Sequence, residues 1–295
     1  MLKCVVFVVT EYGFHYLEKH RKSIDETLND GGVKTLFFRC KKDDTYADAA
    51  LRDSTQDRER YLMEEVLYIT DKVEVLKHLL KQGCYVIALY HDKNRDVSFA
   101  DALYAVDNVE ELTLRAYDEV YRRLAGIPWD ILETQRLKIR ESTVADVTDF
   151  YRIYQEPSIT YYMEDLFQDP DEENAYMESY IRQIYGFYGF GMWTVLLKDT
   201  GQVIGRAGLS IREGYDLPEL GFVIDVSHQG RGYALESCSA ILTYAKEELC
   251  FEQVQALVQE ENKASLKLLR KLGFRHEKNV VERGQEYLFL IKSLQ

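Results

Sequence analysis

Proline, tryptophan and long apolar runs are all scarce in this sequence. Its 295 residues contain 4 prolines and 2 tryptophans, and no apolar stretch approaches the roughly 18 residues that a membrane-spanning helix needs. The first apolar run, residues 4–10, is only one strand long and lacks the layout of a secretory signal peptide. We therefore expect a cytoplasmic protein that does not bind a membrane.

The cysteines are few and follow no disulfide or metal pattern. The five of them are Cys4, Cys40, Cys84, Cys238 and Cys250. Their number is odd, they lie far apart, and no CxxC or HxxxH spacing occurs. Disulfide frameworks and zinc sites need paired, closely spaced residues, so the sequence predicts reduced thiols and no bound metal.

Basic residues are outnumbered by acidic ones. Lysine and arginine total 37 against 50 aspartates and glutamates, the formal net charge is −13, and both halves of the chain are acidic. Nucleic acids and anionic lipids bind to basic patches, so neither is an expected partner. An acidic surface instead favours cationic partners such as amines.

Hydrophobic residues make up 46% of the chain, enough to bury cores, and the length favours two domains. In residues 1–125, apolar runs alternate with amphipathic stretches. Strands are predicted at residues 4–9, 33–38, 66–70, 85–89 and 103–106, and helices at 16–28, 55–65, 73–81 and 109–124. This alternation indicates a doubly wound, Rossmann-like α/β domain with a parallel sheet. Glycine and proline near residues 126–128 break the pattern, so a linker is predicted at 126–133.

Residues 134–295 follow a different, mixed α/β rhythm and form the second predicted domain. Strands are predicted at residues 136–140, 191–197, 203–210, 219–226 and 254–258, with two more at the C-terminus. Helices are predicted after Ser142 or Thr143 and at residues 172–185, 232–249 and 263–272. Asp146 lies near the capping-box position of the first of these helices.

A glycine-rich turn is the most informative segment. Strand 219–226 runs into Gln229-Gly230-Arg231-Gly232-Tyr233-Ala234, which opens a long helix. The first N–H groups of a helix are unpaired and carry the positive end of the helix dipole. Glycines beside them leave room for a pyrophosphate, although a glycine-rich turn without a ligand is the alternative.

This turn resembles the Q/R-x-x-G-x-G/A motif of the GNAT superfamily of acetyltransferases. Residues 134–143 resemble the T-x-R-L-x-L-R opening of its ribosomal-protein-alanine acetyltransferase-like branch, and residues 262–274 resemble the N-x-x-S…K-L-G-F segment of that branch. The resemblance spans residues 134–295 and implies acetyl-coenzyme A as co-substrate. The implied cofactor-binding residues are Phe222, Val223, Ile224, Gln229, Gly230, Arg231, Gly232, Tyr233, Ala234, Asn262 and Ser265. For Asn262 and Ser265 the alternative is a plain helix N-cap and a surface hydroxyl.

The same resemblance implies direct transfer of the acetyl group to a primary amine, on a small molecule or a protein N-terminus. Backbone N–H groups near Phe222 and Val223, beside a bulge in their strand, would bind the thioester carbonyl, and pantetheine would pair with main chain 222–224. Glu219 is the candidate catalytic base, with Glu164 and Asp165 as rival carboxylates. Alternatively, Glu219 is a surface carboxylate without a catalytic role.

The sequence departs from the family pattern at the general acid. Many GNAT enzymes carry a tyrosine seven residues after the asparagine, where this sequence has Leu269. Ser265 or water would then serve, or the thiolate leaves unassisted. This departure keeps open a second function, a non-catalytic acetyl-coenzyme A-binding sensor. Cys238 lies on the apolar face of the long helix and is assigned to the core.

The acceptor site is expected near an aromatic stretch, residues 185–193, in which aromatic residues alternate with glycines. One interpretation is a mobile lip over the amine, with Tyr161 and Tyr162 opposite. The other is a turn whose rings pack in the core, and we expect a mixture of the two.

Residues 1–125 resemble haloacid dehalogenase-like phosphatases in the strands at 1–10, 66–71 and 83–89 and in the segment after them. The two catalytic aspartates of that family correspond to Val8 and Thr10, and a metal-binding carboxylate to Val75, so no phosphatase activity is expected. The domain would instead support a homodimer, cover the acetyltransferase site, or bind a small ligand near Asp71 and His91.

Overall fold

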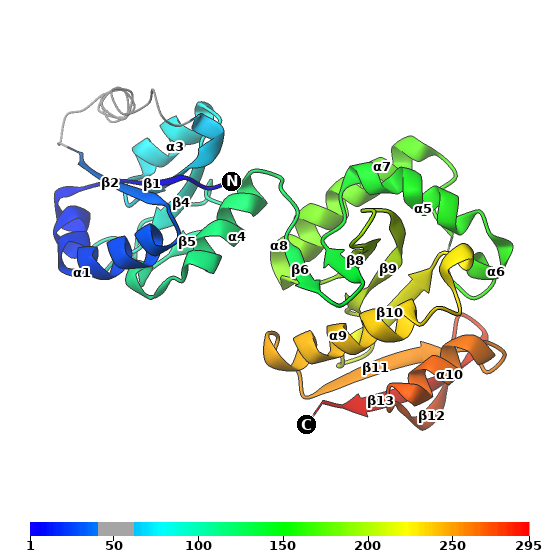
Figure 1. Ribbon diagram of the computed structural model, residues 1–295. Coiled ribbons are helices and arrows are strands. Elements are labelled where there is room, and N and C mark those ends of the chain that lie inside the picture. Colours follow the sequence, from blue (N-terminus) through cyan, green and yellow to red (C-terminus); the bar gives the residue numbers. More distant parts are fainter. Residues whose placement is uncertain (41–61, 164, 295) are drawn as a thin grey trace. The chain divides into compact units, whose positions relative to one another are not determined.

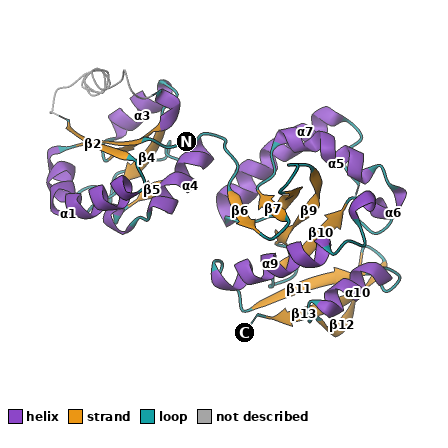
Figure 2. Ribbon diagram, in the orientation of Figure 1, coloured by secondary structure: helices purple, strands orange, loops and turns teal. Residues whose placement is uncertain are grey.

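The computed structural model describes residues 1–40, 62–163 and 165–294. The chain divides into two compact units, Met1–Ile127 and Pro128–Gln295. Each unit is a β-sheet flanked by helices (Figures 1 and 2). None of the helices in the described ranges has the length and apolar character required to cross a membrane.

The N-terminal unit contains a five-stranded sheet in the order β2-β1-β3-β4-β5, and all neighbouring strands are parallel. The strands are β1 (Cys4–Val9), β2 (Lys34–Arg39), β3 (Val66–Thr70), β4 (Tyr85–Leu89) and β5 (Ala105–Val106). The helices are α1 (Glu11–Asp30), η1 (Met63–Glu65), α3 (Val73–Lys81), η2 (Val109–Glu111) and α4 (Leu114–Leu124). The predicted parallel sheet is confirmed, and the helix predicted at 55–65 lies largely outside the described residues.

Helices cover both faces of this sheet. Residues of α1 and α4, such as Leu17 and Tyr117, pack on one face together with Phe7 of β1. Leu76 of α3 packs on the opposite face with Val6 of β1. Because both faces are covered, every residue of β1 is buried and the strand reads as an unbroken apolar run.

The C-terminal unit contains an eight-stranded sheet in the order β12-β13-β11-β10-β9-β8-β7-β6. The strands are β6 (Asp130–Glu133), β7 (Leu137–Arg140), β8 (Met192–Leu197), β9 (Val203–Ser210), β10 (Glu219–Ile224), β11 (Gln253–Val258), β12 (Arg275–Glu282) and β13 (Gln285–Ser293). Neighbouring strands are antiparallel except β10 and β11, which confirms a mixed sheet. β6, an edge strand, occupies residues that we predicted as linker.

Helices also cover both faces of the C-terminal sheet. They are η3 (Val144–Asp146), α5 (Val147–Tyr154), α6 (Pro157–Thr160), α7 (Pro170–Tyr180), η4 (Ile181–Tyr185), α8 (Gly186–Tyr188), η5 (Val226–His228), α9 (Tyr233–Glu247) and α10 (Lys263–Lys271). Ile241 of α9 packs with Leu209 of β9 in the main core. Phe150 of α5 and Met177 of α7 form a second cluster with Val223 of β10.

The predicted capping box at the start of η3 and α5 is present. The Thr143 N–H donates to Asp146 Oδ2 at 2.8 Å, and Asp146 also accepts from Arg140 and the Thr194 hydroxyl. The inward-facing carboxylate therefore joins β7, β8 and the helix that follows.

Candidate functional site

β10 and β11 diverge after a single point of pairing. Only Glu219 and Gln255 are register partners, and the Gln255 N–H donates to the Pro218 carbonyl at 2.9 Å. Along residues 222–224, β10 remains paired with β9 on its other edge. The edge of β10 that faces β11 is therefore open to a ligand that can pair with main chain.

The predicted bulge in β10 is wrong. The register with β9 runs without interruption from Glu219 opposite Ser210 to Ile224 opposite Gly205. A Cβ atom at Gly205 would collide with the carbonyl of Val223, so the glycine lets the two backbones stay close and in step.

The glycine-rich turn joins β10 to α9. Gly230 and Gly232 have φ values of +73° and +85°, in the left-handed region that favours glycine. The Gln229 side chain donates to the Ile224 carbonyl at 2.9 Å and ties the turn to the end of β10. Within the described residues, no side chain caps the N-terminus of α9, which leaves its first N–H groups available to an anion.

Arg136, in the turn between β6 and β7, supports the glycine-rich turn. Its guanidinium donates to the Arg231 carbonyl at 3.0 Å, pairs with Glu236 and lies over the ring of Tyr233 at 4.4 Å. Arg231 is exposed, so its backbone shapes the turn while its side chain lies toward solvent.

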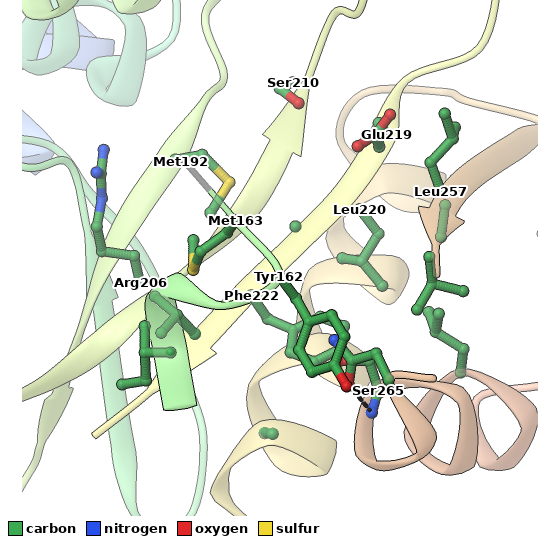
Figure 3. Close-up of a pocket in the computed structure, with 18 of the residues that line it drawn as sticks. Tyr162, Met163, Met192, Arg206, Ser210, Glu219, Leu220, Phe222, Leu257 and Ser265 are labelled. Atoms are coloured by element: carbon green, nitrogen blue, oxygen red, sulfur yellow. Dashed lines mark hydrogen bonds between the residues drawn. The ribbon is translucent and has the colours of Figure 1, made fainter. Parts of the chain in front are cut away.

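A cavity of about 2190 Å³ connects the turn, the open edge of β10 and the helices on the α5–α7 face. It brings together every predicted site residue except Arg231. Those that line it are Glu219, Phe222, Val223, Ile224, Gln229, Gly230, Gly232, Tyr233, Ala234, Asn262 and Ser265. Figure 3 shows Glu219 and Ser210 toward one end of this cavity, and Phe222 and Ser265 toward another.

Asn262 is the N-cap of α10. Its Oδ1 accepts from the Ser265 N–H at 3.1 Å. This is the capping alternative, but Asn262 and Ser265 also line the cavity, so capping and ligand contact are compatible. No described residue accepts from the Asn262 amide N–H groups, so a ligand could do so.

Glu219 is buried in the cavity wall and accepts one hydrogen bond from Arg212 at each carboxylate oxygen. The two Arg212 donors contact the two carboxylate oxygens separately, with Nη2 2.8 Å from Oε1, and Arg212 also pairs with Glu282 at 2.9 Å. The bond to Glu219 raises the pKa of Arg212. Arg212 was not predicted from the sequence, although a basic residue seven positions before the candidate base was a signal for such a pair.

Asp165, Leu269 and Cys238 offer no alternative catalytic group in the cavity wall. Asp165 is exposed and accepts from the Leu166 N–H at 2.8 Å, and Glu164 lies outside the described residues. Leu269 is buried in the main core, so this position supplies no acid. Cys238 is also buried there, as predicted, and burial raises the pKa of its thiol to about 12.

The aromatic stretch 185–193 divides between core and surface. Tyr185 and Trp193 are fully buried, and the Tyr185 hydroxyl accepts from the Ser142 N–H at 3.1 Å. Phe187 and Tyr188 are exposed, and Tyr188 lines the cavity together with Tyr161 and other acceptor-side residues. The expected division between core rings and surface rings is therefore observed.

In the N-terminal unit, the predicted ligand position is occupied by protein groups. Asp71 is buried and accepts from the Thr10 N–H at 2.7 Å, from the Thr10 hydroxyl and from His91 Nε2 at 2.9 Å. Val8 and Val75 are buried in the apolar core. Within the described residues, no three acidic, histidine or cysteine side chains are grouped to hold a metal ion.

Part of the chain is similar to known proteins. Residues 136–275 match the family profile described as Acetyltransferase (GNAT) domain. The chain is 29% identical over 152 residues to the uncharacterized protein YkkB of Bacillus subtilis, covering 50% of this chain and 87% of that one. It is 27% identical over 152 residues to the uncharacterized N-acetyltransferase p20 of Bacillus licheniformis, covering 50% and 84%. A solved acetyltransferase from Agrobacterium tumefaciens is 22% identical with a TM-score of 0.48, covering 55% and 92%.

Proposed function

We propose that this chain acetylates a primary amine directly in a ternary complex. The premise is that residues 136–275 are a GNAT acetyltransferase domain that uses acetyl-coenzyme A. The observation that carries the proposal is one continuous cavity. It extends from the N-terminus of α9 along the open edge of β10 to Glu219 and the acceptor-side aromatic residues.

The proposed binding uses backbone groups. N–H groups of residues 230–234 bind the pyrophosphate, where the glycines allow close approach and the helix dipole favours negative charge. Main chain 222–224 pairs with the pantetheine arm, since β11 leaves this edge open. N–H groups near Phe222 and Val223 donate to the thioester carbonyl, and one such donor typically contributes about 10²–10³ in rate.

In the proposed reaction, the amine nitrogen attacks the carbonyl carbon, a C–N bond forms and the C–S bond breaks. Glu219 accepts the proton of the amine through a water molecule, because Arg212 occupies one direction at each carboxylate oxygen but leaves further lone pairs. The Ser265 hydroxyl or water supplies a proton to the departing thiolate. No enzyme-bound acetyl group forms, and the buried Cys238 takes no part.

The first test is a thiol-release assay with acetyl-coenzyme A and a panel of amines, on wild type and Glu219→Gln. We expect kcat to fall at least about tenfold in the variant, since a positioned base contributes on the order of 10²–10⁴. Calorimetry should give an unchanged Kd for acetyl-coenzyme A. Asp165→Asn, at an exposed carboxylate outside the described cavity lining, is the matched control and should retain full activity.

Two results would contradict parts of this proposal. Equal rates in Glu219→Gln and wild type would show that Glu219 is not the base. Tight binding of acetyl-coenzyme A without turnover of any amine would instead favour a non-catalytic acetyl-coenzyme A-binding sensor. The bidentate Arg212–Glu219 pair and the apolar Leu269 support that second function.

For the N-terminal unit we propose a haloacid dehalogenase-like fold without phosphatase chemistry. Its support is the parallel sheet with helices on both faces, together with valine and threonine at the positions of the family's aspartates. We expect no hydrolysis of p-nitrophenyl phosphate with Mg²⁺ present. Sedimentation of the whole chain and of residues 128–295 would test whether the unit supports a homodimer.

A further inference from the structure

β9 carries a charged side chain, Arg206, in the middle of an otherwise apolar strand. Arg206 is only 8% exposed, its guanidinium lies over the ring of Phe150 at 4.6 Å, and it lines the cavity (Figure 3). The Tyr154 hydroxyl is a hydrogen-bond partner, whereas Nε has no partner among the described residues.

Three other arginines of this unit, two partly buried and one exposed, are paired with carboxylates. The pairs are Arg140–Asp146, Arg152–Asp225 and Arg212–Glu219. In the part of the chain that the structure describes, Arg206 forms no ion pair with a carboxylate. A buried charge without a counter-charge is costly, and no carboxylate among the described residues neutralises this positive group of the cavity wall.

The neighbouring hydroxyls do not supply the missing negative charge. Burial raises the pKa of Tyr154 and Tyr180, so both are neutral phenols near pH 7. Neutral phenols can donate to an anion, and a guanidinium binds carboxylate or phosphate oxygens in a bidentate fork. Together these groups form a lining suited to an oxyanion.

Arg206 also lies close to the proposed reaction centre. It is the register partner of Val223 across β9 and β10, and such partners have Cα atoms about 5 Å apart. Val223 belongs to the backbone proposed to bind the thioester carbonyl. An acceptor whose amine reaches that carbonyl therefore needs only a few bonds to present a second group to Arg206.

We infer that Arg206 binds an anionic group of the acceptor, so that the substrate is a small primary amine that also carries a carboxylate or phosphate. This inference rests on the proposed function, because it specifies the acceptor of that reaction. The same positive charge disfavours polyamines, because the buried Arg206 guanidinium repels their additional ammonium groups.

The test compares acceptors that differ only in the anionic group. Wild-type kcat/KM is measured by thiol release for a series of amino acids, each matched with its primary amide and its decarboxylated amine. Aminoalkyl phosphates provide the second source of negative charge. We expect at least a 30-fold preference for the acid of each productive set over its amide, and the phosphate arm shows which oxyanion fits better.

Substitutions then assign the preference to one side chain. In Arg206→Met the acid-over-amide ratio should fall to within threefold of unity through a higher KM for the acid, while kcat/KM for the amide stays within threefold of wild type. Arg206→Lys should restore part of the preference because it returns the charge without the fork. Arg152→Met removes an arginine that is already paired with Asp225, and it should leave the preference unchanged.

The outcomes separate this inference from the function on which it depends. Equal wild-type rates for acids and amides, or better rates with peptide amides, would overturn the inference and leave the acetyltransferase function intact. No turnover of any amine would overturn both. The wild-type comparison removes the charge from the ligand, so it decides the question even if an Arg206 variant fails to fold. An Arg206 that only braces α5 would lower kcat for all acceptors equally.

Discussion

Both units contain a strand that ends beside the N-terminus of a helix. The two junctions differ in which groups accept hydrogen bonds from the first N–H groups of the helix. In the N-terminal unit, β1 leads into α1, and Thr10 caps the helix by accepting from the Gly13 N–H at 3.2 Å. Asp71 then occupies the position beside the cap with its carboxylate. In the C-terminal unit, β10 leads into α9 through Gly232, which offers no capping side chain.

The two helix N-termini therefore differ in whether a carboxylate of the protein fills the position that attracts an anion. A helix N-terminus attracts negative charge, and in the N-terminal unit the protein's own carboxylate provides it. Gly13 marks how tightly that junction is closed, because a Cβ atom there would collide with the Asp71 carboxylate. At Gly230 a Cβ atom would meet no described atom within 4 Å. The same local architecture is therefore closed in one unit and leaves the proposed cofactor site open in the other.

The largest expected effect on stability comes from removing the Asp71 carboxylate from the junction between β1 and α1. Asp71→Ala should lower the free energy of unfolding of the N-terminal unit by about 3–4 kcal/mol, since it leaves buried donors of Thr10 and His91 without an acceptor. Urea unfolding followed by far-UV circular dichroism measures this loss. Trp129 and Trp193 both belong to the C-terminal unit, so their fluorescence transition and the thiol-release rate should not change.

A double-mutant cycle with Gly13 is the control for this assignment. Gly13→Ala should destabilise wild type through the collision with Asp71, and should be much less harmful in the Asp71→Ala background. Additive losses would mean that Asp71 does not close the junction.

The open junction is tested by filling it. Gly232→Val should weaken acetyl-coenzyme A binding on the order of 100-fold, because it strains a residue with φ +85° and places a side chain at the proposed phosphate position. Titration calorimetry measures the Kd. Gly201→Val, in a hairpin turn with φ +71°, imposes similar strain away from the cavity and should leave the Kd unchanged. Equal effects of the two substitutions would refute a cofactor site at Gly232.

The features that were predicted correctly from the sequence are those encoded by local patterns. The strand–helix alternation of the N-terminal unit, the hairpin, the Thr143–Asp146 capping box and the turn at 229–234 depend on residues close together in the chain, and all are present. By contrast, Arg136 reaches the turn from nearly 100 residues away, and Asp71 reaches Thr10 from 61 residues away. No local pattern encodes such pairings, because they form only when strands become neighbours in the sheet.

Arg206 and the aromatic stretch 185–193 had weaker signals. An arginine inside an apolar strand indicates a buried charge, but alternation alone does not say which face of β9 opens into a cavity. Likewise, Tyr185 and Phe187 are two residues apart, and only tertiary packing makes one fully buried and the other 81% exposed. The splay of β10 from β11 depends on both strands and their connections, so sequence spacing did not predict where pairing ends.

A smaller effect is expected at Asp146, the inward-facing carboxylate of the C-terminal unit. Burial alone would raise its pKa, but bonds from Arg140, the Thr143 N–H and Thr194 outweigh burial and lower it. Its stabilisation is therefore complete above the unfolded-state pKa of about 3.9 and is lost as pH falls through the lower folded-state value. Asp146→Asn should lower the free energy of unfolding by about 2 kcal/mol at pH 7, and by less near pH 3. Tryptophan fluorescence in urea measures both, and a loss independent of pH would contradict the ionic role.

The smallest effect is expected from thiol modification, which compares the cysteines of the two units. Cys4 and Cys84 are buried in the N-terminal unit, Cys238 is buried in α9, and Cys250 is exposed. At pH 8 a thiol with a pKa of about 12 is thiolate in only about 10⁻⁴ of molecules, so Cys238 should resist iodoacetamide. Mass spectrometry of the native protein should find Cys250 alkylated first, with the thiol-release rate within twofold of the untreated enzyme, because Cys250 is not among the described residues that line the cavity. Loss of activity in step with alkylation would instead indicate that a cysteine takes part in transfer, and the direct mechanism would fail.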